Sequence, residues 1–577
     1  MAICHRMLAG TNPFNTQQTG KISVPVIQSL PTTHKWTIAH DLTLGSNPSQ
    51  RYEYLIGNPI SPVEFSLKDE VHIKHARKLK EVRRVLSKAG EEPLEGLFLI
   101  DAIQRLGIEY HFQEEIEAIL QRQYMAIKTD VHKYEDLYEV SLCFRLLRPE
   151  GYYVSPDAFS NFNKQGKFTQ ELSKDVKGVM GLFEASQLSI EGEDILDEAT
   201  NFSRQVLSEL VTHLDPHQAR TVASTLRNPY HKSLGRFMAK NFIVDYRGTN
   251  GWENDLQELA KMDFKVVQSI HQRELLRVSK WWRDLGLAKE LKLARDQPLK
   301  WYMWPMAMLT DPNLSYQRIE LTKPISLIYM IDDIFDLYGT LDELVLFTEV
   351  VKRWDFSAVE QLPDYMKNCF KALYDTTNEI SYNVYKAYGW NPIDSLRETW
   401  ASLCNAFLVE AKWFASGKLP KAEEYLNNGI VSSGVHVVLV HLFFLLGHGR
   451  DKESECLVKD NPGLIISVAT ILRLWDDLGS AKDENQDGYD GSYVEYYMKE
   501  HQSSSVETAR EHVINKISDA WKSLNKECLS PNPFSATFKK ASLNLARMVP
   551  LMYNYDDNHQ LPGLEELATS LLYDHVY

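Results

Sequence analysis

The sequence predicts an all-α protein built from two helical domains. Apolar residues recur at three- and four-residue steps, as in residues 95–111, and strand-like alternation is scarce. The chain has 577 residues, which is too long for one hydrophobic core and makes two domains the first expectation. A hydrophobic fraction of 44% and a charged fraction of 24% are typical of soluble globular proteins.

Residues 1–35 form a leader that precedes Trp36. They contain no Asp or Glu, several Ser and Thr, and a single arginine, Arg6. Leaders that are poor in acids and rich in hydroxyls resemble organelle transit peptides. We therefore expect a chloroplast protein, with a cytoplasmic protein that has an unstructured start as the alternative.

Two helical blocks follow the leader, one over residues 36–235 and one over residues 236–577. The break is placed near residues 227–232 (RNPYHK), where Asn-Pro interrupts the helical periodicity. All motifs that carry chemical information lie in the second block, so the site is expected there.

Charge and hydropathy limit the partners of the chain. A net charge of −15 argues against nucleic acid and anionic membranes, which attract basic surfaces. No apolar run reaches the roughly eighteen residues of a membrane span, and the nearest, residues 435–447, is expected to be a buried helix. We expect a monomer that binds a small molecule. If that molecule is an anion, local cations must overcome the net negative charge.

Three carboxylates interrupt the apolar segment of residues 323–339 (KPISLIYMIDDIFDLYG), namely Asp332, Asp333 and Asp336. Buried carboxylates are costly unless they are paired, protonated or bound to metal. On a regular α-helix, Asp332 and Asp336 project within ~40° of each other. Such an oxygen-only pair suits Mg²⁺ or Mn²⁺, which binds one or two carboxylates together with phosphate oxygens. The alternative is a helix end whose acids face solvent.

A second acidic group lies in residues 469–484 (ATILRLWDDLGSAKDE). Asp476, Ser480 and Glu484 fan over only ~80° of one helix face, unless the helix ends near Gly479. Arg473 lies on the same side. Taken alone, this second acidic group would favour the alternative interpretation, an acidic helix face that is exposed to solvent. Together, the two groups indicate a cleft that holds several divalent ions around one polyanion, with arginines completing the local positive charge.

These residues resemble the class I terpene synthases of plants. Asp332-Asp333-x-x-Asp336 matches the aspartate-rich motif of that family, and Asp476-Asp477-Leu478-x-Ser480-x-x-x-Glu484 matches its second metal motif. Similar stretches extend the resemblance from Trp36 to the end of the chain, at residues 184–199, 301–306, 341–354, 400–414 and 546–558. The resemblance implies a carboxy-terminal class I terpenoid synthase fold, preceded by a non-catalytic, helical barrel-like relict domain.

The resemblance also implies roles for individual residues. The metal ligands would be Asp332, Asp336, Asp476, Ser480 and Glu484, with Asp333 supporting them. Arg295 and Arg473 would grip the diphosphate, and Asp332, Asp336 and Asp476 would bind it through an expected three Mg²⁺ ions, with Mn²⁺ as an alternative. An allylic carbocation would be stabilised by Trp304, with Tyr329, Phe407 and Tyr553 as further candidates. Tyr555–Asn558 is a candidate lid.

Three departures from the family pattern point to the product. Where the family usually has R-x-R, this chain has Arg295-Asp296-Gln297. The positions of the tandem arginines expected before Trp36 hold Val26 and Ile27. The position three residues after the last acid of the second metal motif, which is often basic in the family, is Asp487. The tandem arginines are associated with the isomerisation that precedes ring closure. Their absence, with RDQPLKWYMWPM around Arg295, resembles the subgroup that makes acyclic alcohols. We therefore expect conversion of geranyl or farnesyl diphosphate, or both, to linalool or nerolidol.

Other functions stay open at this point. A cyclising mono- or sesquiterpene synthase would share the same motifs and release a hydrocarbon. A chain-elongating prenyltransferase normally carries a second DD-x-x-D string, which is absent here, as is the D-x-D-D motif of cyclases that protonate an alkene. A non-catalytic helical scaffold would tolerate degenerate metal motifs, whereas both motifs are intact.

Overall fold

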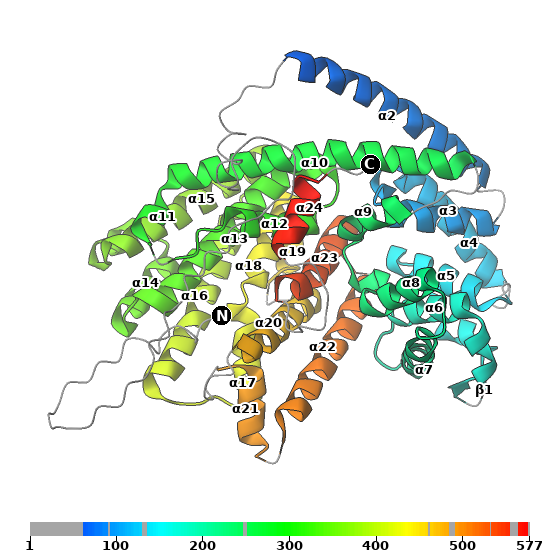
Figure 1. Cartoon of the computed structure of the whole chain (residues 1–577). Coiled ribbons are helices and arrows are strands. Elements are labelled where there is room, and N and C mark those ends of the chain that lie inside the picture. Colours follow the sequence, from blue (N-terminus) through cyan, green and yellow to red (C-terminus); the bar gives the residue numbers. More distant parts are fainter. Residues whose placement is uncertain are drawn as a thin grey trace, which may run out of the picture. The chain divides into compact units, whose positions relative to one another are not determined.

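A computed structural model describes residues 62–577 except 90–92, 130–134, 165, 246–250, 293, 460–461, 484–490, 503, 531, 554–563 and 575–577. The predicted leader and the first part of the predicted amino-terminal domain lie outside the described residues. Nearly all of the described regular structure is helical, which confirms the predicted all-α class (Figure 1). The chain divides into two compact units, Arg6–Ala76 and Arg77–Tyr577 with Met1–His5. The site described below lies within the larger unit.

The helices before the long helix α10 are α2 (Pro62–Ala89), α3 (Pro93–Arg105), α4 (Gln113–Thr129), α5 (Leu137–Leu147), α6 (Val176–Ser186), α7 (Asp194–Leu210), α8 (Pro216–Arg227) and α9 (Gly235–Asp245). Short helical turns between them are η2 (Glu109–His111), η3 (Arg148–Glu150), η4 (Pro156–Phe159), η5 (Gln170–Lys174) and η6 (Tyr230–Lys232). Strands β1 (Asn163–Lys164) and β2 (Lys167–Phe168) form an antiparallel hairpin with Asn163 opposite Phe168.

The later helices are α10 (Gly251–Leu285), α11 (Leu287–Glu290), α12 (Pro298–Met308), α13 (Ser315–Asp333), α14 (Leu341–Arg353), α15 (Asp364–Tyr388), α16 (Ile393–Ser416), α17 (Ala422–Ser432), α18 (Val435–Leu445), α19 (Lys452–Cys456), α20 (Gly463–Asp483), α21 (Tyr493–Glu500), α22 (Val506–Leu529), α23 (Ala536–Met552) and α24 (Leu564–Leu572). Shorter helical segments among them are η7 (Pro312–Leu314), η8 (Ile334–Tyr338) and η9 (Phe356–Gln361).

Helices α6, α7 and α8 share an apolar core in the first block. Val179 and Phe183, one turn apart on α6, pack with Val206 and Leu207 of α7 and Val222 of α8. Residues three and four apart lie on one face of a helix, so this spacing turns a single stripe of each helix inward. The first block is therefore held by ordinary apolar packing.

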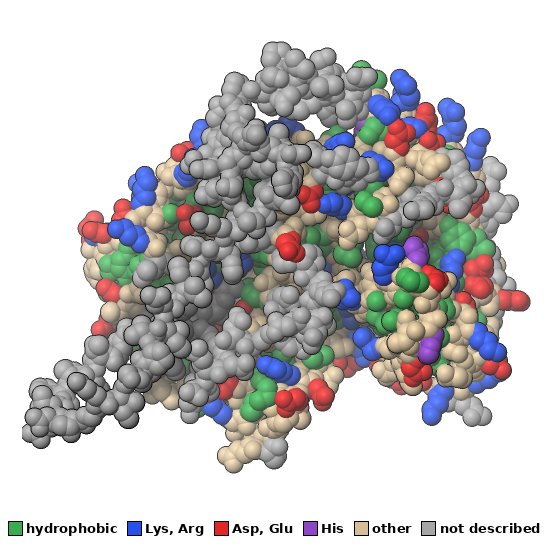
Figure 2. All heavy atoms as spheres, in the orientation of Figure 1, with side chains coloured by type: hydrophobic (Ala, Val, Ile, Leu, Met, Phe, Trp, Pro, Cys, Tyr) green, Lys and Arg blue, Asp and Glu red, His purple; other side chains and the backbone are tan. Residues whose placement is uncertain are grey.

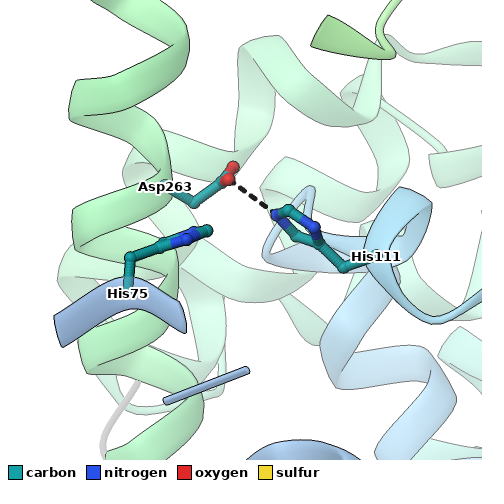
Figure 3. A group of neighbouring side chains, drawn as sticks. All are labelled: His75, His111 and Asp263. Atoms are coloured by element: carbon teal, nitrogen blue, oxygen red, sulfur yellow. Dashed lines mark hydrogen bonds and ion pairs between the residues drawn. The ribbon is translucent and has the colours of Figure 1, made fainter. Parts of the chain in front are cut away.

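A buried carboxylate on α10 joins the long helix to the first block. Asp263 accepts hydrogen bonds from Arg236 and Tyr110 and lies 2.9 Å from Nε2 of His111 (Figure 3). Its side chain is almost fully buried, and the guanidinium of Arg236 supplies the positive charge that a buried carboxylate needs. This cluster therefore fixes one end of α10.

A second buried network fixes two of the helices that carry predicted site residues. Arg318 of α13 donates from Nε and Nη2 to Glu274 of α10, at 2.8 and 2.7 Å, and Tyr302 of α12 donates to the same carboxylate at 2.6 Å. Burial opposes ionisation of Glu274, but the paired guanidinium holds its pKa well below the usual range. The network therefore ties α12 and α13 to α10.

Helix α18 lies in the centre of the second block, with all eleven of its residues buried. This confirms the prediction of a buried helix for the apolar run. The longer stretch Ala422–Leu445 is apolar enough to cross a membrane by composition, but 78% of its most apolar window is buried within the protein. It is also divided into α17 and α18 at Gly434, whose φ of 73° favours glycine. We therefore assign this stretch to the protein core.

The surface carries charges of both signs. On the face drawn in Figure 2, acidic and basic side chains are interspersed wherever described residues are visible, so neither sign dominates that part of the surface.

Candidate active site

A cleft of about 630 Å³, part of it open to solvent, lies among helices α12, α13, α16, α17, α18, α20 and α23. Its walls are mostly apolar and its polar groups come from three helices. The lining residues are Trp304, Ile325, Ile328, Tyr329, Phe407, Val435, Val438, Leu472, Leu545 and Tyr553, with the polar residues Asp332, Ser432, Ser433, Arg473 and Asp476. The two acidic groups that the sequence singled out therefore meet at one cleft.

The aspartate-rich motif lies where α13 changes its winding. Asp332 and Asp333 form the end of α13, whereas Asp336 lies in η8, a π-helical turn closed by a 2.9 Å bond from the Gly339 N–H to the Ile334 carbonyl. The ~40° separation expected for Asp332 and Asp336 applies only to a regular α-helix. Because the chain enters a wider π turn before Asp336, the angle between the two side chains differs from that value. Single π turns within α-helices occur frequently at functional sites.

Arg295 contacts the same carboxylates from the loop before α12. Its Nη2 lies 2.5 Å from Asp332 and 2.7 Å from Asp333, and its backbone N–H donates to Asp333 at 2.8 Å. Its guanidinium also stacks 4.8 Å from the centre of the Tyr329 ring. Arg295 therefore contacts Asp332, which lines the cleft, and its neighbour Asp333.

The second motif lies on α20, which continues through Gly479 to Asp483. The alternative of a helix that ends near Gly479 is therefore excluded, because the packed helix outweighs the weak helix propensity of one glycine. Asp476 is buried and faces the cleft. Its neighbour Asp477 accepts from the Tyr425 hydroxyl and the Tyr493 N–H, so it anchors the helix. The side chain of Ser480, together with Glu484, lies outside the described residues, as does the candidate lid Tyr555–Asn558.

Electrostatics indicate that the acidic cluster needs positive charge. Burial, reinforced by the nearby Asp332 carboxylate, raises the pKa of Asp336 to about 9. Burial also raises the pKa of Asp333, although Arg295 opposes the shift. Without added positive charge, these carboxyl groups do not all ionise at neutral pH. A hard divalent cation such as Mg²⁺ or Mn²⁺ would supply that charge and prefers oxygen ligands. Asp332, Asp336 and Asp476 are the members of the predicted ligand set whose side chains the structure describes.

Arg473 is buried in a network that crosses three helices. It contacts Asp476 at 3.4 Å, donates to the Gly429 carbonyl at 3.4 Å and donates to Ser432 Oγ at 3.1 Å. Ser432 in turn donates to Glu410 at 2.6 Å. The guanidinium is therefore held at the cleft wall by α17 as well as by its own helix.

Gly429 allows Arg473 to occupy this position. A Cβ added at Gly429 would lie 3.0 Å from Cγ and Nε of Arg473. We expect Gly429→Ala to displace the guanidinium of Arg473 and to lower kcat by about tenfold, as measured in a steady-state assay. This factor corresponds to the loss of one charge-assisted hydrogen bond. The matched control is Asn427→Ala, which raises helix propensity at an exposed position of the same helix. Equal kcat values for the two variants would show that the position of Arg473 does not matter.

The four aromatic residues expected to face a carbocation all line the cleft. Trp304, Tyr329 and Phe407 are buried, and the Trp304 ring N–H lies 3.3 Å from the Tyr329 hydroxyl. Tyr553 completes the group, with its ring centre 6.4 Å from that of Trp304. The walls of the cleft therefore present π faces to whatever it contains.

Three residues near the cleft were not singled out from the sequence. Glu410 is a buried acid within an apolar helix, the same signal that drew attention to the aspartate-rich motif. Lys300 interacts electrostatically with Arg295 and Asp476, and Ser432 bonds to Arg473. No sequence signal marks Lys300 or Ser432, because their positions depend on how distant helices pack.

Known proteins resemble this chain in sequence and in fold. Residues 283–523 match the model of the terpene synthase family, metal binding domain, and residues 58–226 match the terpene synthase, N-terminal domain. An (E)-nerolidol synthase from Cannabis sativa is 56% identical over 522 residues, covering 88% of this chain and 94% of that relative. A chloroplastic tricyclene synthase from Antirrhinum majus is 48% identical over 582 residues, covering 100% of both chains.

A solved structure agrees with these sequence matches. Isoprene synthase from grey poplar (Populus x canescens), in complex with three Mg²⁺ ions and dimethylallyl-S-thiolodiphosphate, aligns with a TM-score of 0.81 at 35% identity, covering 92% of this chain and 99% of that chain. The match confirms the expected class I fold with its helical amino-terminal domain. The chain therefore belongs to the plant terpene synthase family and is a metal-binding enzyme that acts on allylic diphosphates.

Proposed function

We propose that this enzyme ionises geranyl or farnesyl diphosphate, or both, and adds water to the resulting cation to release linalool or nerolidol. The observation that carries the proposal is one apolar, aromatic cleft that Asp332, Asp476 and Arg473 also line. Such a cleft suits both products of ionisation, because its charged residues suit the diphosphate and its apolar walls suit the hydrocarbon chain.

The residues divide the chemistry between them. Divalent ions held by Asp332, Asp336 and Asp476, with Ser480 and Glu484 as further proposed ligands, would act as Lewis acids that stabilise the leaving diphosphate. Arg295 and Arg473 lie beside these carboxylates, where they can hold the same anion. Trp304 and the other aromatic residues then face the allylic cation, each contact contributing about 0.5–2 kcal/mol. The apolar walls keep most water away from the cation.

Two considerations favour an acyclic alcohol. The positions of the tandem arginines associated with isomerisation hold Val26 and Ile27. In addition, a 56% identical relative is an (E)-nerolidol synthase. The second candidate is a cyclising synthase, which the 48% identity to a tricyclene synthase favours.

Product analysis tests the proposal. The purified full chain is incubated with Mg²⁺ and either geranyl or farnesyl diphosphate, and the products are separated by chiral gas chromatography with mass spectrometry. We expect linalool from the first substrate and nerolidol from the second. Exclusively cyclic products would replace the proposal with the second candidate. Longer prenyl diphosphates on addition of isopentenyl diphosphate would indicate a prenyltransferase.

We also propose import into chloroplasts, supported by the acid-poor leader and by the chloroplastic tricyclene synthase that aligns over its whole length. Expression of the full chain fused at its carboxyl terminus to a fluorescent protein tests this. Fluorescence spread through the cytoplasm would contradict it.

A further inference from the structure

Lys300 lies on the first turn of α12, the helix that brings Trp304 to the cleft. Trp304 follows it by four residues on the same face of the helix and lines the cleft. The lysine is partly buried, and its ammonium interacts electrostatically with Arg295 and with Asp476. Lys300 therefore shares a helix face with a residue that lines the cleft, and it lies within electrostatic range of Asp476.

Arg295 and Arg473 already have partners, whereas the ammonium of Lys300 has none among the described residues. Arg295 is bonded to Asp332 and Asp333, and Arg473 to Asp476 and Ser432. Within the part of the chain that the structure describes, Lys300 forms no hydrogen bond and no ion pair within 4.0 Å. A lysine can donate three hydrogen bonds, so all of its capacity is left for another molecule.

The surroundings of Lys300 disfavour its charge in the free protein. Burial, and then repulsion from Arg295, lower its pKa, although Asp476 partly offsets them. An arrangement of two cations that repel each other beside buried acids is expected to be stabilised by an anion together with metal ions. A compact ammonium is a common phosphate-binding group, although it lacks the fork of arginine.

We propose that Lys300 binds the diphosphate of the substrate directly, as a third cationic residue beside Arg295 and Arg473. This inference rests on the proposed function, because it assumes a prenyl diphosphate in the cleft. Lys300 would act on the diphosphate alone, so its contribution should be the same for substrates of ten and fifteen carbons. Gln297, at the position where the R-x-R pattern places a second arginine, is exposed, so Lys300 is the better placed of the two.

The test compares Lys300→Gln and Lys300→Arg with the control Lys289→Gln, which removes the same charge from an exposed position on α11. Binding of inorganic diphosphate in the presence of Mg²⁺ is measured by calorimetry, alongside kcat/KM for geranyl and farnesyl diphosphates. We expect Lys300→Gln to weaken diphosphate binding and kcat/KM by about tenfold to a hundredfold, as for one charge-assisted hydrogen bond. Lys300→Arg should retain most of both, and the control should match the wild type.

The opposing outcomes are distinct. If Lys300 only repels metal ions from Asp476, Lys300→Gln will bind Mg²⁺ more tightly and will keep its affinity for diphosphate, which would overturn the proposal. Equal losses in Lys300→Gln and Lys300→Arg would indicate a requirement for shape and not for charge, and would also overturn it. If the wild type turns over neither prenyl diphosphate, the proposed function fails, yet the calorimetric comparison still decides whether Lys300 binds diphosphate.

Discussion

Replacing Asp332 and Asp336 together with alanine is expected to lower kcat by more than about a hundredfold, the scale on which removal of charge stabilisation at a leaving group acts. The two carboxylates are the proposed metal ligands of α13 and η8, so their loss would remove part of the site for the ions that neutralise the departing diphosphate. Turnover is measured from product formation at saturating Mg²⁺. Glu349→Gln is the control, since it removes an exposed acid from α14.

The stability of the metal-free protein distinguishes loss of ligands from loss of fold. Because the pKa of Asp336 is raised to about 9, its carboxyl stabilises the fold while protonated and loses that contribution as the pH rises from about 4 through 9. Asp336→Asn should therefore be at least as stable as the wild type at pH 8, by thermal denaturation, while its turnover falls. Retention of most activity in the double alanine variant would place the metal site elsewhere.

Arg473→Lys is expected to lower kcat by about tenfold to a hundredfold with little change in thermal stability. Lysine keeps the positive charge beside Asp476, Asp477 and Glu410, but it cannot reproduce the fork that reaches Gly429 and Ser432 at the same time. Arg473→Met should behave differently, since loss of a buried charge opposite carboxylates costs about 3–5 kcal/mol of stability. Steady-state kinetics and thermal denaturation separate the two effects.

Arg353→Lys provides the matched control, because Arg353 is exposed at the end of α14. A wild-type kcat for Arg473→Lys would mean that charge alone suffices at this position. The proposed role of the oriented guanidinium would then be lost, while the metal site would be unaffected.

Much of the site could be predicted because its signals are local. Asp332, Asp336 and Asp476 are acids in apolar helical segments. Burial of a carboxylate costs free energy unless it is paired, protonated or bound to metal, so acids in such segments indicate a functional site from sequence alone. The same reasoning placed Arg473 beside Asp476, and the structure brings both to the cleft. The all-helical class followed from periodicity, which is also a local property.

Other features depend on contacts between distant segments and could not be predicted. The π turn at Ile334–Tyr338 adds no composition signal, and α20 continues past Gly479 because its neighbours hold it. Lys300 resembles any surface lysine until the fold brings it within electrostatic range of Asp476. Glu410 could have been found, since it is a lone acid in an apolar run, but its link to Arg473 through Ser432 required the packing of α16, α17 and α20.

The π turn also sets how this region tolerates changes in chain length. Each residue of a regular α-helix turns the chain by ~100°, and a π turn accommodates one more residue than an α turn does. Deleting Ile334 or Phe335 would let the turn rewind as ordinary helix and would place Asp336 three residues after Asp332 instead of four, which changes its position around the helix axis by ~100°. Loss or gain of a single codon here should thus be far less tolerated than most amino-acid replacements at the same positions.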